Sequence, residues 1–481
     1  MTSSNSFEQV KPNIQLLTDE QIQEVHKYSI NILENIGIKV ESKTAIKIFA
    51  KSGSVRIENE VVYIQEELIN HSIKSVQSSV DIFNKNGDLT FQLGRNQKRT
   101  FFGIGVTNTY FQDIETNQVE TFKRHHMQLG SQLGDMLNNY EMISTLGVPS
   151  DIETEQLDLY TTFDMYTNTA KPLVLLISEG KQIKDIFELL ITLHGDISAK
   201  PFIIPYFNPI TPLIMNKSTT DKMIASLEFN LPIMYSNFSM YGGTSPITES
   251  GSLALLNAEL LAGLVFSQLV KEGSAVILGS LPAAFHMTTM GSHYTPSSYL
   301  LNLACSEMMN YYKIPHCGTS GSGNGWGPDL IASGELWMNH LTSCLGKIGC
   351  APFVGGNFDS MAFSPTTVVL SDYIIGKARK FSNGFILNEE KINLIDIKDV
   401  HHGGNYLTSA QTLESISELD ITDSCWPSLN LDSWKEQKRP EAKKFLIDYT
   451  KELWEKAKIR VEKNKDMVRE QEEIIRKISS T

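Results

Sequence analysis

The chain has 481 residues, of which 41% are hydrophobic and 20% are charged, as is usual for a globular protein. Its formal net charge is −13, whereas a sequence-independent grip on nucleic acid or on an anionic membrane requires an excess of Lys and Arg, so neither partner is expected. The 32 glycines and 17 prolines are ordinary numbers and exclude a collagen-like or low-complexity chain.

Residues 1–100 predict a small α+β unit, which we interpret as a structural cap. Thr18 is suited to be the N-cap of an amphipathic helix, and a short helix follows near Lys43–Lys51. Two hairpins are expected, over Val55–Ile64 and Val80–Leu93, with a helix at Glu66–Val76 between them.

From residue 101 to 385, short apolar runs alternate with helical stretches at spacings of roughly 30–40 residues, which suits one βα unit each. The runs are nearly continuously apolar, as expected for parallel strands buried on both faces. Eight such units predict an α/β fold of the (β/α)8 TIM barrel type, and the first turn lacks the GxGxxG of a dinucleotide-binding sheet. The eight runs are Phe101–Val106, Met142–Leu146, Pro172–Ile177, Phe202–Phe207, Pro232–Ser236, Ala275–Gly279, Ile314–Gly318 and Ala351–Gly355.

Residues 386–481 depart from this repeat and predict a C-terminal helical extension. An extended acidic stretch comes first, and a long charged helix runs from Pro440 to the end. Its Lys- and Glu-rich composition is typical of a solvated helix or one that packs against another subunit, so we expect a homo-oligomer.

The five cysteines form no CxxC pair and are too few for a disulfide framework at this length. The first residues are polar and lack the apolar core of a signal peptide. No run of about 18 uninterrupted apolar residues is present, so no membrane-spanning helix is expected. These features predict reduced thiols and a cytoplasmic protein.

In a barrel of this kind the active site lies on the loops that follow the strands. These loops are rich in aromatic residues, Asn, Ser and Gly, and poor in Lys and carboxylates. A glycosidase pair of acids, an HExxH metal motif, a GxSxG nucleophile elbow and a GxxxxGK[ST] phosphate loop are all missing from the sequence. We therefore predict neither a catalytic acid–base pair nor a metal site.

Aromatic faces without competing lysines suit a cation that cannot donate hydrogen bonds, such as a quaternary ammonium group. Trp326, between two glycines in the seventh loop, is the strongest single candidate for such a cage, and asparagines could bind a substrate carboxylate. Phe238, Thr319 and Asp359 also lie at the predicted loop tips. The residues we predict to bind substrate are Phe102, Tyr206, Asn237, His286, Tyr294, Trp326, Phe353 and Asn357.

Four blocks spread over nearly the whole chain carry a family resemblance. They are LLTDEQIQEVHKYSINILENIGIKVES, GSLALLNAELLAGLVFSQLVKEGSAVILGS, IPHCGTSGSGNGWGPDLIASGELWMNHLTSCLGKI and VHHGGNYLTSAQTLESI. With these blocks the sequence resembles the trimethylamine methyltransferase family, specifically its members that lack pyrrolysine and act on quaternary amines such as glycine betaine.

The resemblance implies a TIM barrel that docks a separate corrinoid protein over its mouth, where the Co(I) corrin (cobalamin) accepts a methyl group from the substrate nitrogen. Trimethylamine members carry pyrrolysine and this chain has only standard residues, which argues against trimethylamine as substrate. Glycine betaine is then the first candidate, with proline betaine or carnitine next. Two alternatives stay open: a barrel that binds a betaine without turnover, and a hydrolase, which would need a metal or carboxylate pair.

Overall fold

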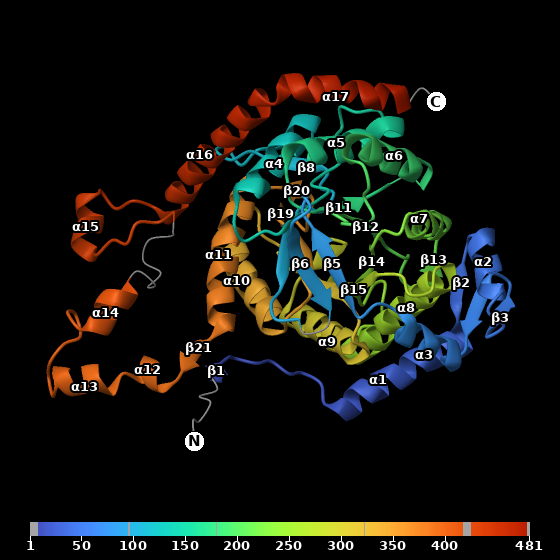
Figure 1. The fold of residues 1–481 in the computed structure, drawn as a ribbon, viewed down its shortest axis with the longest axis horizontal. Coiled ribbons are helices and arrows are strands. Elements are labelled where there is room, and N and C mark those ends of the chain that lie inside the picture. The colour runs from blue at the N-terminus through green and yellow to red at the C-terminus, as the bar shows by residue number, and fades with distance from the viewer. Residues whose placement is uncertain (1–7, 95–96, 179, 322, 417–424, 479–481) are drawn as a thin grey trace.

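The computed structural model describes residues 8–94, 97–178, 180–321, 323–416 and 425–478, and its centre is a closed barrel of eight parallel strands (Figure 1). The strands neighbour one another in chain order, and β18 returns to pair with β7. All eight predicted runs form barrel strands, which confirms the predicted fold. The strands are β7 (Phe101–Ile104), β10 (Met142–Ser144), β11 (Leu173–Leu176), β12 (Ile203–Phe207), β14 (Ile233–Tyr241), β15 (Val276–His286), β17 (His316–Gly318) and β18 (Cys350–Val354).

Each barrel strand is followed by a helix that packs outside the barrel. The helices are α4 (Arg124–Met136), α5 (Leu157–Asn168), α6 (Ile183–His194), α7 (Lys217–Glu228), α8 (Glu249–Val270), α9 (Pro296–Tyr312), α10 (Leu330–Leu345) and α11 (Pro365–Asn383), with 3-10 turns at Thr154–Gln156 and Gly180–Gln182. Helix α8 is long and apolar enough to cross a membrane, but 83% of its most apolar window is buried inside the protein.

The N-terminal unit packs against the side of the barrel and does not cap its mouth. It consists of α1 (Asp19–Asn31) with a π-helical turn at Ile32–Ile36, β2 (Ile38–Val40), α2 (Lys43–Ala50), β3 (Val55–Glu58), β4 (Val61–Ile64) and α3 (Glu66–Ser75). Helices α1, α2 and α3 all contact α8, and β13 (Ile214–Met215), from a barrel loop, pairs with β2. The Thr18 hydroxyl accepts a hydrogen bond from the backbone N–H of Gln21 and so caps the N-terminus of α1, as predicted.

The hairpin of β5 (Ser79–Phe83) and β6 (Leu89–Gly94) closes the end of the barrel where the strands begin. Its side chains Val80, Ile82, Phe91 and Leu93 are buried together with the side chains that fill the barrel interior. Phe91 stacks on Phe101, the first residue of β7, with ring centroids 4.7 Å apart. In the described part of the chain the hairpin therefore covers this end of the interior, and a ligand can enter from the opposite end, where the strands finish.

The C-terminal extension has two parts. In the first, β21 (Phe385–Leu387) pairs with β1 (Glu8–Val10), and α12 (Glu389–Ile392), α13 (Leu394–Val400), α14 (Ala410–Ser415) and α15 (Leu431–Glu436) lie away from the barrel (Figure 1). In the second, α16 (Ala442–Lys463) and α17 (Lys465–Ile478) return to cross α4 and α6.

The predicted single charged helix from Pro440 is instead two helices that break at Asn464 and pack on this chain's own barrel. Four apolar residues of α16 form a buried stripe at helical spacing, namely Leu446, Leu453, Trp454 and Ala457. Arg124 of α4 also pairs with Glu472 of α17 at 2.6 Å. The prediction from the sequence missed this narrow apolar stripe, because it relied on the Lys- and Glu-rich composition of the segment.

We expect Phe91→Ala to lower the free energy of unfolding by about 3–5 kcal/mol, because it leaves a cavity in the apolar packing that closes this end of the barrel. Chemical denaturation followed by circular dichroism measures this change. Leu89→Ala, on the same hairpin but with Leu89 57% exposed, is the control and should change it by less than about 0.5 kcal/mol. Equal effects of the two changes would show that the hairpin does not close the barrel.

Candidate functional site

A cavity of about 330 Å³ lies at the mouth of the barrel, where the strands finish. Five strands or their following loops contribute, as the barrel rule requires. Most of its wall is apolar or aromatic. The lining residues are Val106, Phe238, Met240, Leu281, Gly291, Ser292, Tyr294, Thr319, Phe353, Asp359 and Ser360.

Two strands that continue beyond the others build the wall of the cavity. Strands β14 and β15 stay paired from Ile233 and Val276 as far as Tyr241 and Ala284. Alternate residues of a strand face the same side, so Phe238 and Met240 both line the cavity. Strand β15 then turns back through β16 (Gly291–His293), which brings Tyr294 to the mouth.

The floor of the cavity is a neutral aromatic pair. Phe353 meets Tyr206 edge-on, with ring centroids 4.9 Å apart. The Tyr206 hydroxyl is hydrogen-bonded to the Ser236 hydroxyl and accepts from Nδ2 of Asn208 at 2.9 Å. Burial raises the pKa of the Tyr206 phenol well above its usual range, so it stays protonated.

Among the described residues that line the cavity, Asp359 is the one with a charged side chain. Its Oδ2 accepts from the Ser292 backbone N–H at 2.9 Å, and its Oδ1 accepts from the Ser292 hydroxyl. Burial raises the pKa of Asp359, and the hydrogen bonds from Ser292 oppose that shift. A carboxylate in this setting can face a cation without a competing Lys or Arg in the wall.

A strained turn holds Asp359 in place. Phe358, Asp359 and Ser360 have φ values of 52°, 57° and 61°, in the left-handed region that non-glycine residues rarely adopt. The backbone N–H groups of Phe358 and Asp359 donate to the carbonyls of Gly325 and Gly323 at 2.9 and 3.2 Å. The short strands β19 (Gly356–Asn357) and β20 (Ala362–Phe363) flank the turn, and β20 joins β8 (Tyr110–Gln112) and β9 (Val119–Thr121). Strain of this kind persists only where the surroundings enforce it, and it gathers at functional sites.

Three of the eight predicted site residues come together at this mouth. Tyr294 and Phe353 line the cavity, and Tyr206 lies directly beneath Phe353. Tyr294 is 8% exposed and Phe353 is 3% exposed, so both rings are largely withdrawn from solvent.

The structure places three other predicted residues where they have structural partners. Phe102 points outward from β7, with the His340 ring edge-on at 5.5 Å and the Arg379 guanidinium at 5.2 Å. Asn237 faces α8, where its amide donates to Leu256 and Glu259 and accepts from Ser280. Asn357 donates to Gln112 and accepts from Thr367. Both amide hydrogens of Asn237 are taken, so none is left for a substrate carboxylate, and the amide nitrogen and oxygen of Asn357 each have a partner within the protein.

His286 and Trp326 lie near the mouth but outside the cavity wall. His286 Nδ1 bonds Thr289, within the turn that joins β15 to β16. The Trp326 side chain is 65% exposed, and its loop is fixed through the backbone, since Gln112 Nε2 donates to the Trp326 carbonyl at 2.7 Å. Trp326 therefore does not enclose the cavity in this structure.

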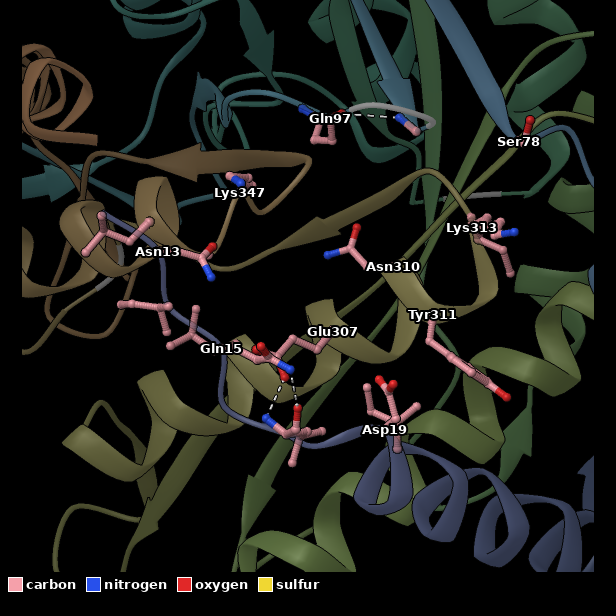
Figure 2. A pocket seen from close by; sticks show the side chains of 18 residues that line it. Asn13, Gln15, Asp19, Ser78, Gln97, Glu307, Asn310, Tyr311, Lys313 and Lys347 are labelled. Carbon is pink, nitrogen blue, oxygen red and sulfur yellow. Dashed lines mark hydrogen bonds between the residues drawn. The ribbon is translucent and has the colours of Figure 1, made fainter. Parts of the chain in front are cut away.

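A larger cavity, of about 820 Å³, lies at the other end of the strands (Figure 2). Lys313 and Lys347 border it, and they come just before β17 and β18. The Glu307 carboxylate accepts from the backbone N–H groups of Leu16 and Leu17 at 2.7 and 2.8 Å, which ties the N-terminal segment across α9 (Figure 2). This space is a seam between that segment and the barrel helices, far from the mouth.

The family model described as trimethylamine methyltransferase (MTTB) matches residues 2–465. This chain belongs to that family. The glycine betaine methyltransferase of Desulfitobacterium hafniense is 24% identical over 436 residues, which cover 89% of this chain and 90% of that one. The trimethylamine methyltransferase of Methanosarcina thermophila is 25% identical over 415 residues, covering 84% and 85% of the two chains.

Two solved structures of monomethylamine methyltransferase share the fold of this family member. The hydroxylamine complex has a TM-score of 0.55 at 9% identity, covering 92% of this chain and 88% of that one. The Methanosarcina barkeri enzyme has a TM-score of 0.51 at 10% identity, covering 93% and 96%. At these identities the likeness supports the barrel fold alone.

Several lining residues of this methyltransferase-family chain were missed because the strand ends were placed too early. The sequence predicts that strands five and six stop at Ser236 and Gly279, whereas they continue to Tyr241 and His286. Their continuation carries Met240 and Leu281 to the mouth. The alternation of apolar residues at Phe238 and Met240 was the available signal.

The described residues contain no group of three or more His, Cys, Asp or Glu side chains placed to hold a metal ion. The cysteines Cys305, Cys317, Cys344 and Cys350 are buried and unbridged, and Cys425 is half-buried. Burial raises the pKa of the Cys305 and Cys344 thiols to about 12, which makes them poor nucleophiles.

We expect Asn237→Ala to lower the free energy of unfolding by roughly 2–3 kcal/mol while leaving the KM for substrate unchanged. The physical reason is that the buried Glu259 carboxylate loses one of its donors, which sits at 2.8 Å. Denaturation and steady-state kinetics on the same preparation measure both quantities. Asn310→Ala, at an exposed position of α9, is the control. A raised KM with unchanged stability would instead place Asn237 against the substrate.

Proposed function

We propose that this protein transfers a methyl group from a quaternary amine to the Co(I) corrinoid of a partner protein that docks over the barrel mouth. The observation that carries the proposal is the cavity itself. Its described lining consists mainly of apolar and aromatic side chains, with one carboxylate and without a pair of groups suited to acid–base catalysis.

The wall matches the properties of a quaternary nitrogen, which is permanently positive and cannot donate hydrogen bonds. Such a cation is held by the faces of aromatic rings, each contributing about 0.5–2 kcal/mol depending on desolvation. Phe238, Tyr294 and Phe353 supply rings from three separate strands or loops. Asp359 adds a counter-charge at the edge of this wall.

The volume of the cavity separates the substrate from the cofactor. About 330 Å³ accommodates a small amine but not a corrin macrocycle, so the corrinoid has to stay on its own protein and approach from outside. Its reduced cobalt supplies the nucleophile that accepts the methyl group. The work left to this chain is to bind the amine, aim one methyl group outward and exclude water.

Methyl loss from a quaternary nitrogen releases a neutral tertiary amine. No negative charge develops on the leaving group, so a general acid has no proton to supply. The neutral floor formed by Tyr206 and Phe353 suits this requirement, because the phenol stays protonated and the ring offers only an apolar face.

Glycine betaine is the first substrate to test, since the Desulfitobacterium relative carries that name, and proline betaine and carnitine come next. The carboxylate of a betaine would have to point away from Asp359, toward the open side of the cavity. A quaternary amine without a carboxylate has no such constraint. The charge of Asp359 therefore divides the possible substrates into two classes.

The function predicts that the purified protein, mixed with free cob(I)alamin and a quaternary amine, produces methyl-Co(III) absorbance. Glycine betaine, proline betaine, carnitine and tetramethylammonium form the panel, with trimethylamine as the comparison. Calorimetric binding of a betaine with no methyl transfer to any corrinoid would favour the alternative, a barrel that only binds its ligand. No binding and no transfer across the panel would contradict both.

We expect Asp359→Asn to raise the KM for tetramethylammonium about tenfold and to leave that for glycine betaine unchanged or lowered, since the change removes a negative charge. Because the pKa of Asp359 is raised, binding of the cation by the unchanged protein should weaken in acid at a higher pH than an ordinary aspartate would give. Both KM values are measured on one preparation, so a loss of folded protein affects the two substrates equally and does not change their ratio. Equal changes for both substrates would mean that Asp359 does not face the nitrogen.

A further inference from the structure

An arm of the chain, residues 385–416, lies outside the barrel and has no core of its own. It comprises β21, α12, α13 and α14, and it extends away from the barrel in Figure 1, where it is coloured orange. None of its residues is buried. A segment of this length with regular structure and no buried side chain is incomplete by itself.

The arm nevertheless carries eleven large apolar side chains, each between 44% and 76% exposed. At such exposures each contributes on the order of 100 Å² of apolar surface, so their total exceeds the roughly 300–600 Å² of the largest patch on a typical monomer. The residues are Phe385, Ile386, Leu387, Ile392, Leu394, Ile395, Ile397, Tyr406, Leu407, Leu413 and Ile416.

The root of the arm lies at the end of the barrel opposite the mouth. It follows α11, whose Arg379 donates to the Thr100 carbonyl and to the Glu141 carboxylate. Thr100 and Glu141 immediately precede β7 and β10. The arm therefore leaves the barrel where the strands begin, at the end opposite the cavity.

We propose that the arm packs against a second copy of this chain. A corrinoid partner has to reach the mouth and then leave it, whereas so large an apolar surface requires a permanent cover that is always present in equal amount. Another copy of the chain meets both conditions.

The area agrees with this assignment. A stable interface buries about 800 Å² on each partner, and the apolar side chains of the arm supply that amount. The ribbon of β1 and β21 at the root has only two strands, and no third strand among the described residues pairs with either. An identical ribbon on the second copy would continue it, as a two-fold interface places the same surface on both subunits.

The test compares the unchanged protein with two variants by analytical ultracentrifugation at micromolar concentration. The arm variant is Ile395→Glu combined with Leu407→Glu, at side chains 72% and 76% exposed. The matched control is Ile459→Glu, because Ile459 on α16 is 68% exposed but lies on a helix that packs on its own barrel. Circular dichroism and the melting temperature verify that each variant is folded.

We expect the unchanged protein and the Ile459→Glu control to sediment as more than one chain, and the folded arm variant to sediment as one, with its dissociation constant raised at least 100-fold. Hydrogen exchange of the unchanged protein should also become slower over 385–416 as the protein concentration rises. A single-chain mass for the unchanged protein overturns the proposal. An arm variant that keeps its assembly, or a control that loses it equally, overturns it too. None of these outcomes depends on methyl transfer, so the proposed function is tested separately.

Discussion

The apolar packing between hairpin β5–β6 and the barrel interior decides from which end a ligand can enter the barrel. A closed parallel barrel has two ends, and side chains fill its middle. The hairpin buries Phe91 and Leu93 against the first residues of the strands, which removes one end from solvent. The carboxyl ends of the strands are then the remaining entrance to the interior, and the 330 Å³ cavity lies there.

The chemistry proposed for that cavity follows from the absence of a hydrogen on the substrate nitrogen. An amine with N–H groups would require acceptors and a means of moving a proton. To bind a quaternary nitrogen, a site needs only aromatic ring faces, a counter-charge and the exclusion of water. The residues at the mouth supply these through Phe353, Tyr294 and Asp359, and the polar groups nearby are already engaged with one another.

The barrel could be predicted from the sequence because its strands are buried on both faces, which leaves continuous apolar runs at regular spacing. The residues that form the site were harder to predict. Tyr294 lies in the loop after the sixth predicted strand and Phe353 lies inside the eighth, and both reach the site. Asn237 directly follows the fifth predicted strand, yet its side chain turns outward to Glu259. A sequence gives the residue type but not the face of the barrel to which it points. The strain that holds Asp359 arises from hydrogen bonds to the distant Gly323 and Gly325 and has no local sequence signal. Trp326 was attractive for its flanking glycines, yet the same glycines allow its loop to be fixed through the backbone and leave the ring in solvent.

The two ends of the barrel face opposite physical demands. Under the proposed function the mouth has to receive a partner and release it, whereas the large apolar surface of the arm has to stay covered. At the mouth, Phe353 on the cavity floor is only 3% exposed, Phe238 on the wall is 39% exposed and Trp326 beside it is 65% exposed. At the arm no residue is buried, and Leu407 is 76% exposed. Since the arm leaves the barrel at the end opposite the cavity, the proposed contact between two copies can be permanent while the mouth stays free to exchange substrate and partner.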